Sequence, residues 1–227
     1  MAATDPTSAE PAEDFSELIH PLYSRALQVV YQPRPAPIVV PQDNKAELYT
    51  VARDTIGDRA ITYLEFGVHE GWSFLEILRR FAHPDARFTG FDSFEGLPEL
   101  FTSGMDRGHF STAGKTPSVA DWRASFVKGW FQNTVPMFLA MNRITGPVLV
   151  HFDADLYSST LFLLTTLWHH VPEYFFIFDE FQPFENVAMY DFTRAYPVRF
   201  EFIACTQDEH RRPQQLFGRM RRIEFAP

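Results

Sequence analysis

The stretch Tyr63-Leu64-Glu65-Phe66-Gly67-Val68-His69-Glu70-Gly71-Trp72-Ser73 predicts the end of a buried strand, a glycine-containing turn and the start of a helix. Glycine allows a sharp turn and lets a ligand come close to the backbone. The first turn of the helix offers unpaired N–H groups, with the Ser73 hydroxyl beside them. Glu65 lies at the carboxyl end of the strand, where open α/β sheets bind ligands, and a carboxylate there suits a cationic or hydroxyl-bearing ligand. For this stretch alone, an ordinary strand-to-helix turn explains the pattern equally well.

Strand and helix patterns alternate from residue 60 onward, which predicts an α/β fold with a doubly wound, mostly parallel sheet. The expected strands are Ala60–Phe66, Arg87–Asp92, Ser125–Lys128, Val148–Phe152, Tyr174–Asp179, Val198–Ala204 and Gln214–Ile223. The expected helices after the first strand are Trp72–Phe81, Val135–Met141, Ser159–His169 and Phe184–Tyr196. A polar loop joins the last two strands, which we therefore expect to form an antiparallel hairpin.

The chain is predicted to have three parts. Residues 1–13 have no apolar periodicity and are expected to be a disordered tail. Residues 14–58 are expected to form a helical N-terminal cap, with a proline-rich extended connector between its helices, and residues 59–227 the main domain. Within that domain, Glu95–Trp122 has no periodicity and follows the carboxyl end of the second strand. We expect this segment to be a lid or substrate loop.

Composition narrows the class of protein. The net charge of −9, with three lysines among 20 basic residues, argues against nucleic acid or an anionic membrane surface as a partner. No apolar run is long enough to span a membrane, and the acidic N-terminus does not resemble a signal peptide. The single cysteine, Cys205, excludes an intramolecular disulfide and fits a reducing compartment. We therefore expect a cytoplasmic protein, and a homo-oligomer remains open.

Acidic residues follow several of the expected strands. Asp92 lies roughly 20 residues beyond the glycines of the first turn, a spacing typical of a carboxylate that binds ribose hydroxyls. A nicotinamide cofactor is a poor candidate, because the G-x-G-x-x-G spacing is absent.

Four further carboxylates are expected to converge at one edge of the sheet. Asp153 and Asp155 follow one expected strand, and residue alternation places both on the same side. Asp179 and Glu180 follow the neighbouring strand. Like charges so close would repel unless a cation lay among them, and oxygen ligands suit a hard ion such as Mg²⁺. For any single one of these acids, a helix N-cap is the alternative interpretation.

Five motifs, taken together and in order, resemble those of the macrocin O-methyltransferase-like family. They are Glu65-Phe66-Gly67-Val68, the segment Gly90-Phe91-Asp92-Ser93-Phe94-Glu95-Gly96-Leu97-Pro98-Glu99, Lys128-Gly129-Trp130-Phe131-Gln132-Asn133-Thr134, the segment His151-Phe152-Asp153-Ala154-Asp155-Leu156-Tyr157-Ser158-Ser159-Thr160, and Phe178-Asp179-Glu180. Members of this family are metal-dependent methyltransferases that use S-adenosylmethionine to modify hydroxyls of sugars and other natural products. The resemblance implies a Rossmann-like methyltransferase sheet whose last strand is antiparallel.

The resemblance also implies roles for individual residues. Those that would hold S-adenosylmethionine are Glu65, Gly67, Ser73, Asp92, Ser93, Gly129 and Trp130. Asp153, Asp179 and Glu180 would bind Mg²⁺, and Asp155 would be the general base. The family usually has two aspartates where this chain has Asp179 and Glu180.

These observations predict an O-methyltransferase that depends on S-adenosylmethionine and Mg²⁺ and acts on a hydroxylated small molecule. Two alternatives stay open: another metal-dependent enzyme on the same scaffold, such as a hydroxylase, or a cofactor-binding protein without catalysis. Substrate specificity is expected to lie in the N-terminal region and in Glu95–Trp122.

Overall fold

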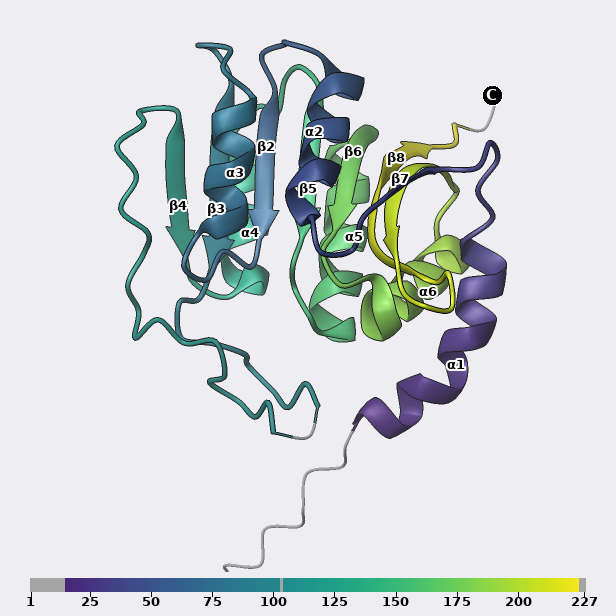
Figure 1. Cartoon of the computed structure of the whole chain (residues 1–227). Coiled ribbons are helices and arrows are strands. Elements are labelled where there is room, and N and C mark those ends of the chain that lie inside the picture. Colours follow the sequence, from purple (N-terminus) through teal and green to yellow (C-terminus); the bar gives the residue numbers. More distant parts are fainter. Residues whose placement is uncertain (1–14, 103, 225–227) are drawn as a thin grey trace, which may run out of the picture.

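The structure is a computed structural model that describes residues 15–102 and 104–224 (Figure 1). Its centre is an eight-stranded sheet in the order β1-β7-β8-β6-β5-β2-β3-β4, in which only β8 runs antiparallel to its neighbours. The strands are β1 (Ile38–Val40), β2 (Thr62–Phe66), β3 (Arg87–Asp92), β4 (Ala124–Lys128), β5 (Val148–Phe152), β6 (Glu173–Phe178), β7 (Val198–Gln207) and β8 (Pro213–Arg222). The disordered tail expected at 1–13 lies outside the described residues.

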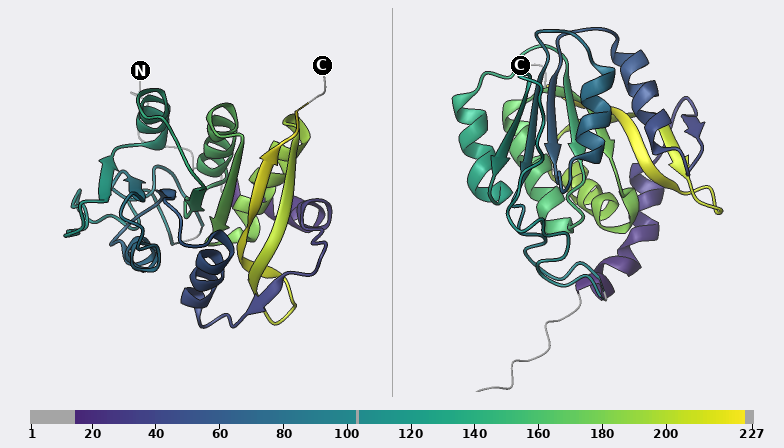
Figure 2. Two further views of the ribbon diagram at one scale, coloured as in Figure 1. Left: turned by 90° about the horizontal axis from the view of Figure 1, so that it is seen from above. Right: turned by 60° about the vertical axis from the view of Figure 1, so that its left-hand side comes forward.

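Helices cover both faces of the sheet (Figures 1 and 2). The helices are α1 (Phe15–Val30), α2 (Lys45–Ile56), α3 (Trp72–Arg80), α4 (Phe131–Met141), α5 (Tyr157–His170), the short π-helix η1 (Phe181–Glu185) and α6 (Asn186–Ala195). The helices α2 and α3 lie on one face, α4, α5 and α6 on the other, and α1 packs beside α6. None of the helices in these described residues is long and apolar enough to cross a membrane.

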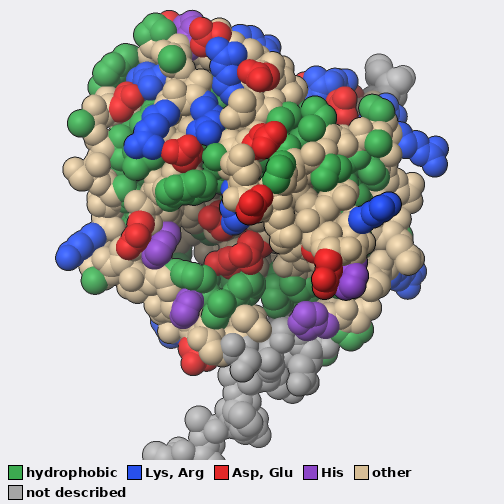
Figure 3. Space-filling view, viewed as in Figure 1, with side chains coloured by type: hydrophobic (Ala, Val, Ile, Leu, Met, Phe, Trp, Pro, Cys, Tyr) green, Lys and Arg blue, Asp and Glu red, His purple; other side chains and the backbone are tan. Residues whose placement is uncertain are grey.

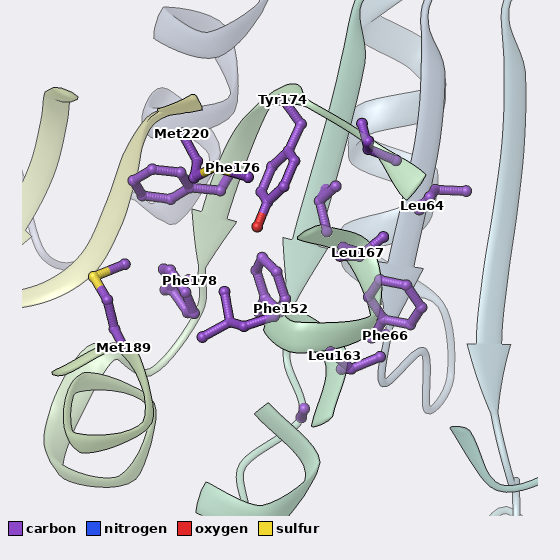
Figure 4. Close-up of a cluster of buried hydrophobic side chains, with 14 of the residues drawn as sticks. Leu64, Phe66, Phe152, Leu163, Leu167, Tyr174, Phe176, Phe178, Met189 and Met220 are labelled. Carbon is purple, nitrogen blue, oxygen red and sulfur yellow. The ribbon is translucent and has the colours of Figure 1, made fainter. Parts of the chain in front are cut away.

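Successive side chains of the central strands point alternately into two apolar cores, one on each face of the sheet. Leu64 and Phe66 of β2 point into the core under α4, α5 and α6, where Phe152 and Phe178 stack with ring centroids 4.7 Å apart (Figure 4). Tyr63 belongs to the opposite core, with α2 and α3. Each fully buried phenylalanine contributes about 1.5–3 kcal/mol of hydrophobic stabilisation, so this aromatic interior fixes the helices on the sheet. By the same alternation, Glu65 shares a face with Tyr63.

The α/β class, the parallel centre and the antiparallel terminal hairpin are confirmed. One element was not expected: Ile38–Val40, inside the proline-rich connector, forms the edge strand β1, parallel to β7. A strand of three residues with a single buried side chain, Val40, is too short to give a periodic signal. The sheet therefore has eight strands, with an extra one from the region before β2.

A long loop, residues 93–123, runs along the carboxyl edge of the sheet between β3 and β4 (Figure 1). Its side chains Leu97 and Phe101 are buried in a third apolar cluster with Ile19 and Tyr23 of α1 and with Phe184 of η1. This loop and the N-terminal helix, which are distant in sequence, therefore form one wall beside the carboxyl ends of the strands.

Candidate active site

A cavity opens at the carboxyl ends of β2, β3, β4 and β5, and we call it the main cavity. The space that it offers amounts to about 890 Å³, which includes volume open to solvent. Figure 3 shows acidic side chains gathered in a hollow on this side of the molecule. The predicted site residues that line the main cavity are Gly67, Asp92, Ser93, Gly129, Trp130, Asp153, Asp155 and Glu180.

Three predicted site residues do not line the main cavity. Ser73 and Asp179 line a second cavity, beside α2 and α3. Glu65 lines neither of these two cavities and is fully buried; its carboxylate accepts hydrogen bonds from the Ser73 hydroxyl at 2.6 Å and from the Tyr63 hydroxyl. The carboxylate expected to face the cofactor is thus directed toward its own strand and helix in this structure.

Gly67 lets the end of β2 touch the turn that follows β5. Its φ is +94°, and a Cβ built on it would lie 1.8 Å from the backbone oxygen of Asp153. Only glycine fits here, because any side chain would collide with the main chain. This close approach brings two predicted parts of the site, the first turn and Asp153, together at one wall of the main cavity.

Asp92 joins the ends of β2 and β3. Its Oδ2 accepts the backbone N–H groups of Val68 and His69, both at 2.8 Å, and its Oδ1 accepts that of Phe94 at 2.7 Å. A carboxylate has about four acceptor positions, so these three hydrogen bonds leave capacity at Oδ1 for a ligand hydroxyl. Ser93, the next residue, donates to the backbone oxygen of Gly96 at 3.1 Å and shapes the start of the loop.

The segment between β4 and α4 closes the main cavity on the side of β4. Gly129 has a φ of +140°, and its N–H donates to the backbone oxygen of Asp92 at 2.9 Å. Trp130 follows directly and precedes the first residue of α4. Both residues line the main cavity together with Asp92, the residue predicted to bind the ribose of the cofactor.

Four carboxylates come together where β5 and β6 end, and we call Asp153, Asp155, Asp179 and Glu180 the acid cluster. The strands β5 and β6 are parallel neighbours, and the Asp179 N–H donates to the backbone oxygen of Phe152 at 2.9 Å. β5 ends at Phe152, so strand alternation does not reach Asp155, contrary to the sequence argument. Asp155 lines the main cavity from a left-handed turn with φ of +58°.

The carboxylates of the acid cluster are buried close together and disfavour one another's ionisation. Burial, together with the charges of Glu180 and Asp179, raises the pKa of Asp155 to about 7. Burial and the charge of Asp179 likewise raise the pKa of Asp153 well above its usual range and raise that of Glu180. Three of the four carboxylates therefore bind protons more strongly than they would in water.

Asp179 is the exception, because it lies against Lys45 and His151. Burial opposes its ionisation, yet these two neighbours hold the pKa of Asp179 below its usual range. The Lys45 Nζ lies 2.8 Å from Oδ2, and the Gln215 amide donates to Oδ1 at 2.5 Å. His151, fully buried, places Nε2 3.7 Å from Oδ1, and its Nδ1 lies 3.0 Å from the Tyr63 hydroxyl.

Sequence reasoning missed Lys45, Gln215 and Tyr63. Lys45 and Asp179 are 134 positions apart, and no local pattern brings them together. One signal was available: a lysine in the first turn of a helix is unfavourable beside the helix dipole and therefore suggests another partner.

The profile of the macrocin-O-methyltransferase (TylF) family matches residues 43–199. The chain belongs to this family. It is an S-adenosylmethionine-dependent O-methyltransferase, as the sequence motifs predicted. The matched segment runs from just before α2 to the start of β7 and includes every predicted site residue.

Solved methyltransferase structures share this fold. The calicheamicin methyltransferase CalS11 is 20% identical, with 96% of this chain and 99% of that chain covered and a TM-score of 0.56. A second, ligand-free structure of CalS11, described as a TDP-rhamnose 3′-O-methyltransferase, is 21% identical over 94% of this chain and 88% of that one, with a TM-score of 0.51. An O-methyltransferase from Bacillus cereus is 12% identical over 95% and 94%, with a TM-score of 0.50. A search of curated proteins found no match.

The donor chemistry of the acid cluster suits a divalent ion, but the side chains are not arranged as a metal site. Carboxylate oxygens are the ligands that Mg²⁺ prefers. Among the described residues of this chain, however, no three His, Cys, Asp or Glu side chains are positioned so that together they could hold a metal ion. Asp179 is held by Lys45 on the side of the second cavity, while Asp155 and Glu180 line the main cavity.

Proposed function

We propose that this enzyme transfers the methyl group of S-adenosylmethionine to a hydroxyl of a small molecule, such as a sugar or another natural product, with a divalent ion at the acid cluster. The observation that carries the proposal is that one cavity is lined both by Asp92 and Gly129, beside which the nucleoside of the cofactor would lie, and by the base candidate Asp155. The cofactor and the acceptor would therefore share a single space.

The transfer needs an aligned oxygen, carbon and sulfur. The acceptor oxygen forms a bond to the methyl carbon while the carbon–sulfur bond breaks, and S-adenosylhomocysteine leaves as the neutral thioether. Most of the rate gain would come from holding the two molecules in this geometry. The walls that can do so are the first turn around Gly67, the segment at Gly129 and loop 93–123, all of which line the main cavity.

Asp155 would accept the hydroxyl proton. A general base works best when its pKa lies near the working pH, and the pKa of Asp155 is raised to about 7 by burial and by the neighbouring carboxylates. Asp155 lines the main cavity from a left-handed turn, whereas Asp153 lines both the main and the second cavity. Asp155 is therefore our candidate for the base.

A divalent ion, when bound, would orient the acceptor oxygens and lower the pKa of the hydroxyl. Asp153, Asp179 and Glu180 are the residues that would hold it, and carboxylate oxygens are the donors that such an ion prefers. Binding through Asp179 requires its ion pair with Lys45 to open.

The sugar acceptor is supported by the name of one structural neighbour, a TDP-rhamnose 3′-O-methyltransferase. The test is a mass-spectrometric screen of wild-type protein with S-adenosylmethionine, Mg²⁺ and panels of sugars and phenols. We expect methylation of at least one hydroxylated panel compound, at a rate lower by about 10²-fold or more with the Asp155→Asn variant. Methylation of amines or thiols, but of no hydroxyl compound, would contradict the proposal.

A further inference from the structure

Lys45 is the first residue of α2, a position where a positive charge is unfavourable. The positive end of the helix dipole repels a cation in the first turn. Asn44, the residue before the helix, makes no side-chain cap hydrogen bond. Nothing in the helix itself therefore explains a lysine here, and its reason lies in what its ammonium group contacts.

That contact is the acid cluster. The Lys45 Nζ lies 2.8 Å from Asp179 Oδ2. The Asp179 side chain is 11% exposed, and the Lys45 side chain is 44% exposed. The positive charge of Lys45 also favours the ionised forms of Asp153 and Glu180. The lysine lines the second cavity together with Tyr49, Asp153 and Asp179. It thus reaches the acid cluster from the second cavity.

Both oxygens of Asp179 are occupied. Oδ1 accepts the Gln215 amide at 2.5 Å and faces His151, and Oδ2 pairs with Lys45. Among the described residues, the ion pairs found to the acid cluster are those of Lys45 and His151, both with Asp179. An added cation can therefore reach Asp179 most simply through the position that the ammonium group takes.

We propose that the Lys45 ammonium is the built-in cation of the acid cluster and competes with a divalent ion for Asp179. The competition rests on the proposed function, since it assumes that an ion enters this cluster. The exchange needs no movement of α2, because Leu48, Tyr49 and Ala52 anchor that helix in the core. Only the half-exposed lysine side chain must swing toward solvent, which a flexible four-carbon stem allows.

The test is a titration with Mn²⁺, followed by the electron paramagnetic resonance signal of the free ion. It compares wild-type protein with Lys45→Met, which keeps the apolar stem and removes the charge, and with Lys45→Arg, which keeps the charge. The matched control is Lys115→Met, which removes the same charge from an exposed loop position. Circular dichroism melting shows that each variant is folded, and Lys45→Gln replaces Lys45→Met if the latter does not fold.

We expect Lys45→Met to bind Mn²⁺ at least about tenfold more tightly than wild type, because a positive charge next to the ion repels it at low effective dielectric. Lys45→Arg and Lys115→Met should stay close to wild type. If only Lys45→Met binds Mn²⁺, the lysine is the permanent cation, and the divalent ion in the proposed function is wrong for the wild-type enzyme. If both proteins bind Mn²⁺ and Lys45→Met binds it no more tightly than wild type, the competition is wrong and the proposed function is untouched. If neither protein binds Mn²⁺, both the competition and the divalent ion of the proposed function are wrong.

Discussion

Asp155 combines an unusual backbone with an unusual charge state. Its φ of +58° is a conformation that aspartate and asparagine tolerate better than other residues with a Cβ, and its buried carboxylate has a pKa raised to about 7. Asp155→Asn therefore keeps the turn and removes only the basicity. We predict that kcat falls by about 10² or more, the usual scale for losing a general base, while cofactor affinity is kept.

The companion variant is Asp153→Asn, which should weaken binding of the divalent ion itself. Steady-state kinetics at saturating Mg²⁺ and Mn²⁺ titrations of both variants separate the two roles. If Asp155→Asn lost the ion and kept kcat, the assignments of the two aspartates would be exchanged.

Glu185 is a buried acid without a hydrogen-bond partner for either oxygen among the described residues. Burial, with the charges of Asp153, Asp155, Asp179 and Glu180, raises the pKa of Glu185 well above its usual range. A raised folded-state pKa means that stability falls as the pH rises above the unfolded pKa, because the unfolded chain ionises first. Glu185→Gln removes this loss.

We therefore predict that Glu185→Gln stabilises the fold relative to wild type by an amount that grows from about pH 5 to about pH 8. Urea unfolding at the two pH values measures the difference. The control is Glu209→Gln, at a side chain 86% exposed, which should show no such trend. A difference that is the same at both pH values would show that ionisation of Glu185 does not limit stability.

At the scale of elements, loop 93–123 and α1 support each other beside the main cavity. Phe101 is 8% exposed, and its ring centroid lies 5.1 Å from that of Phe184. Phe101→Ala should lower the free energy of unfolding by about 3 kcal/mol, the low end of the usual range for a buried phenylalanine, since its cluster is peripheral. It should also raise KM for the acceptor, because the neighbouring loop residues Leu97 and Pro98 line the main cavity.

Phe110 provides the contrast within the same loop, because it lines the main cavity but is 41% exposed. Phe110→Ala should change stability by no more than about 0.5 kcal/mol. Urea unfolding and acceptor kinetics check both variants. Equal stability loss in the two would mean that the cluster with α1 does not hold the loop.

At the scale of the whole molecule, the sequence predicted the features that depend on repeated local patterns. Long apolar runs marked the central strands, and parallel strands must end at one edge, which brought Asp92, Asp153, Asp155 and Glu180 to a common cavity. The divalent ion, the roles of the site residues and the three-part division of the chain stay predictions.

What the sequence could not predict depends on how distant elements pack. The Lys45–Asp179 pair exists because the first residue of α2 lies beside the residue that follows β6, and no local pattern encodes that position. The direction of the Glu65 carboxylate depends on two hydroxyl partners, Tyr63 and Ser73, which approach it from the same strand and from α3. The strand β1 is defined by its pairing with β7 and not by its own residues.

The central claim is that the main cavity holds S-adenosylmethionine next to the acid cluster. Equilibrium dialysis of the full chain against labelled S-adenosylhomocysteine tests it most directly. We predict binding of one molecule per chain, with a dissociation constant in the range of about 1 μM to 1 mM that is usual for enzyme ligands. If folded protein retains no label at about 1 mM ligand, the account of this site is contradicted.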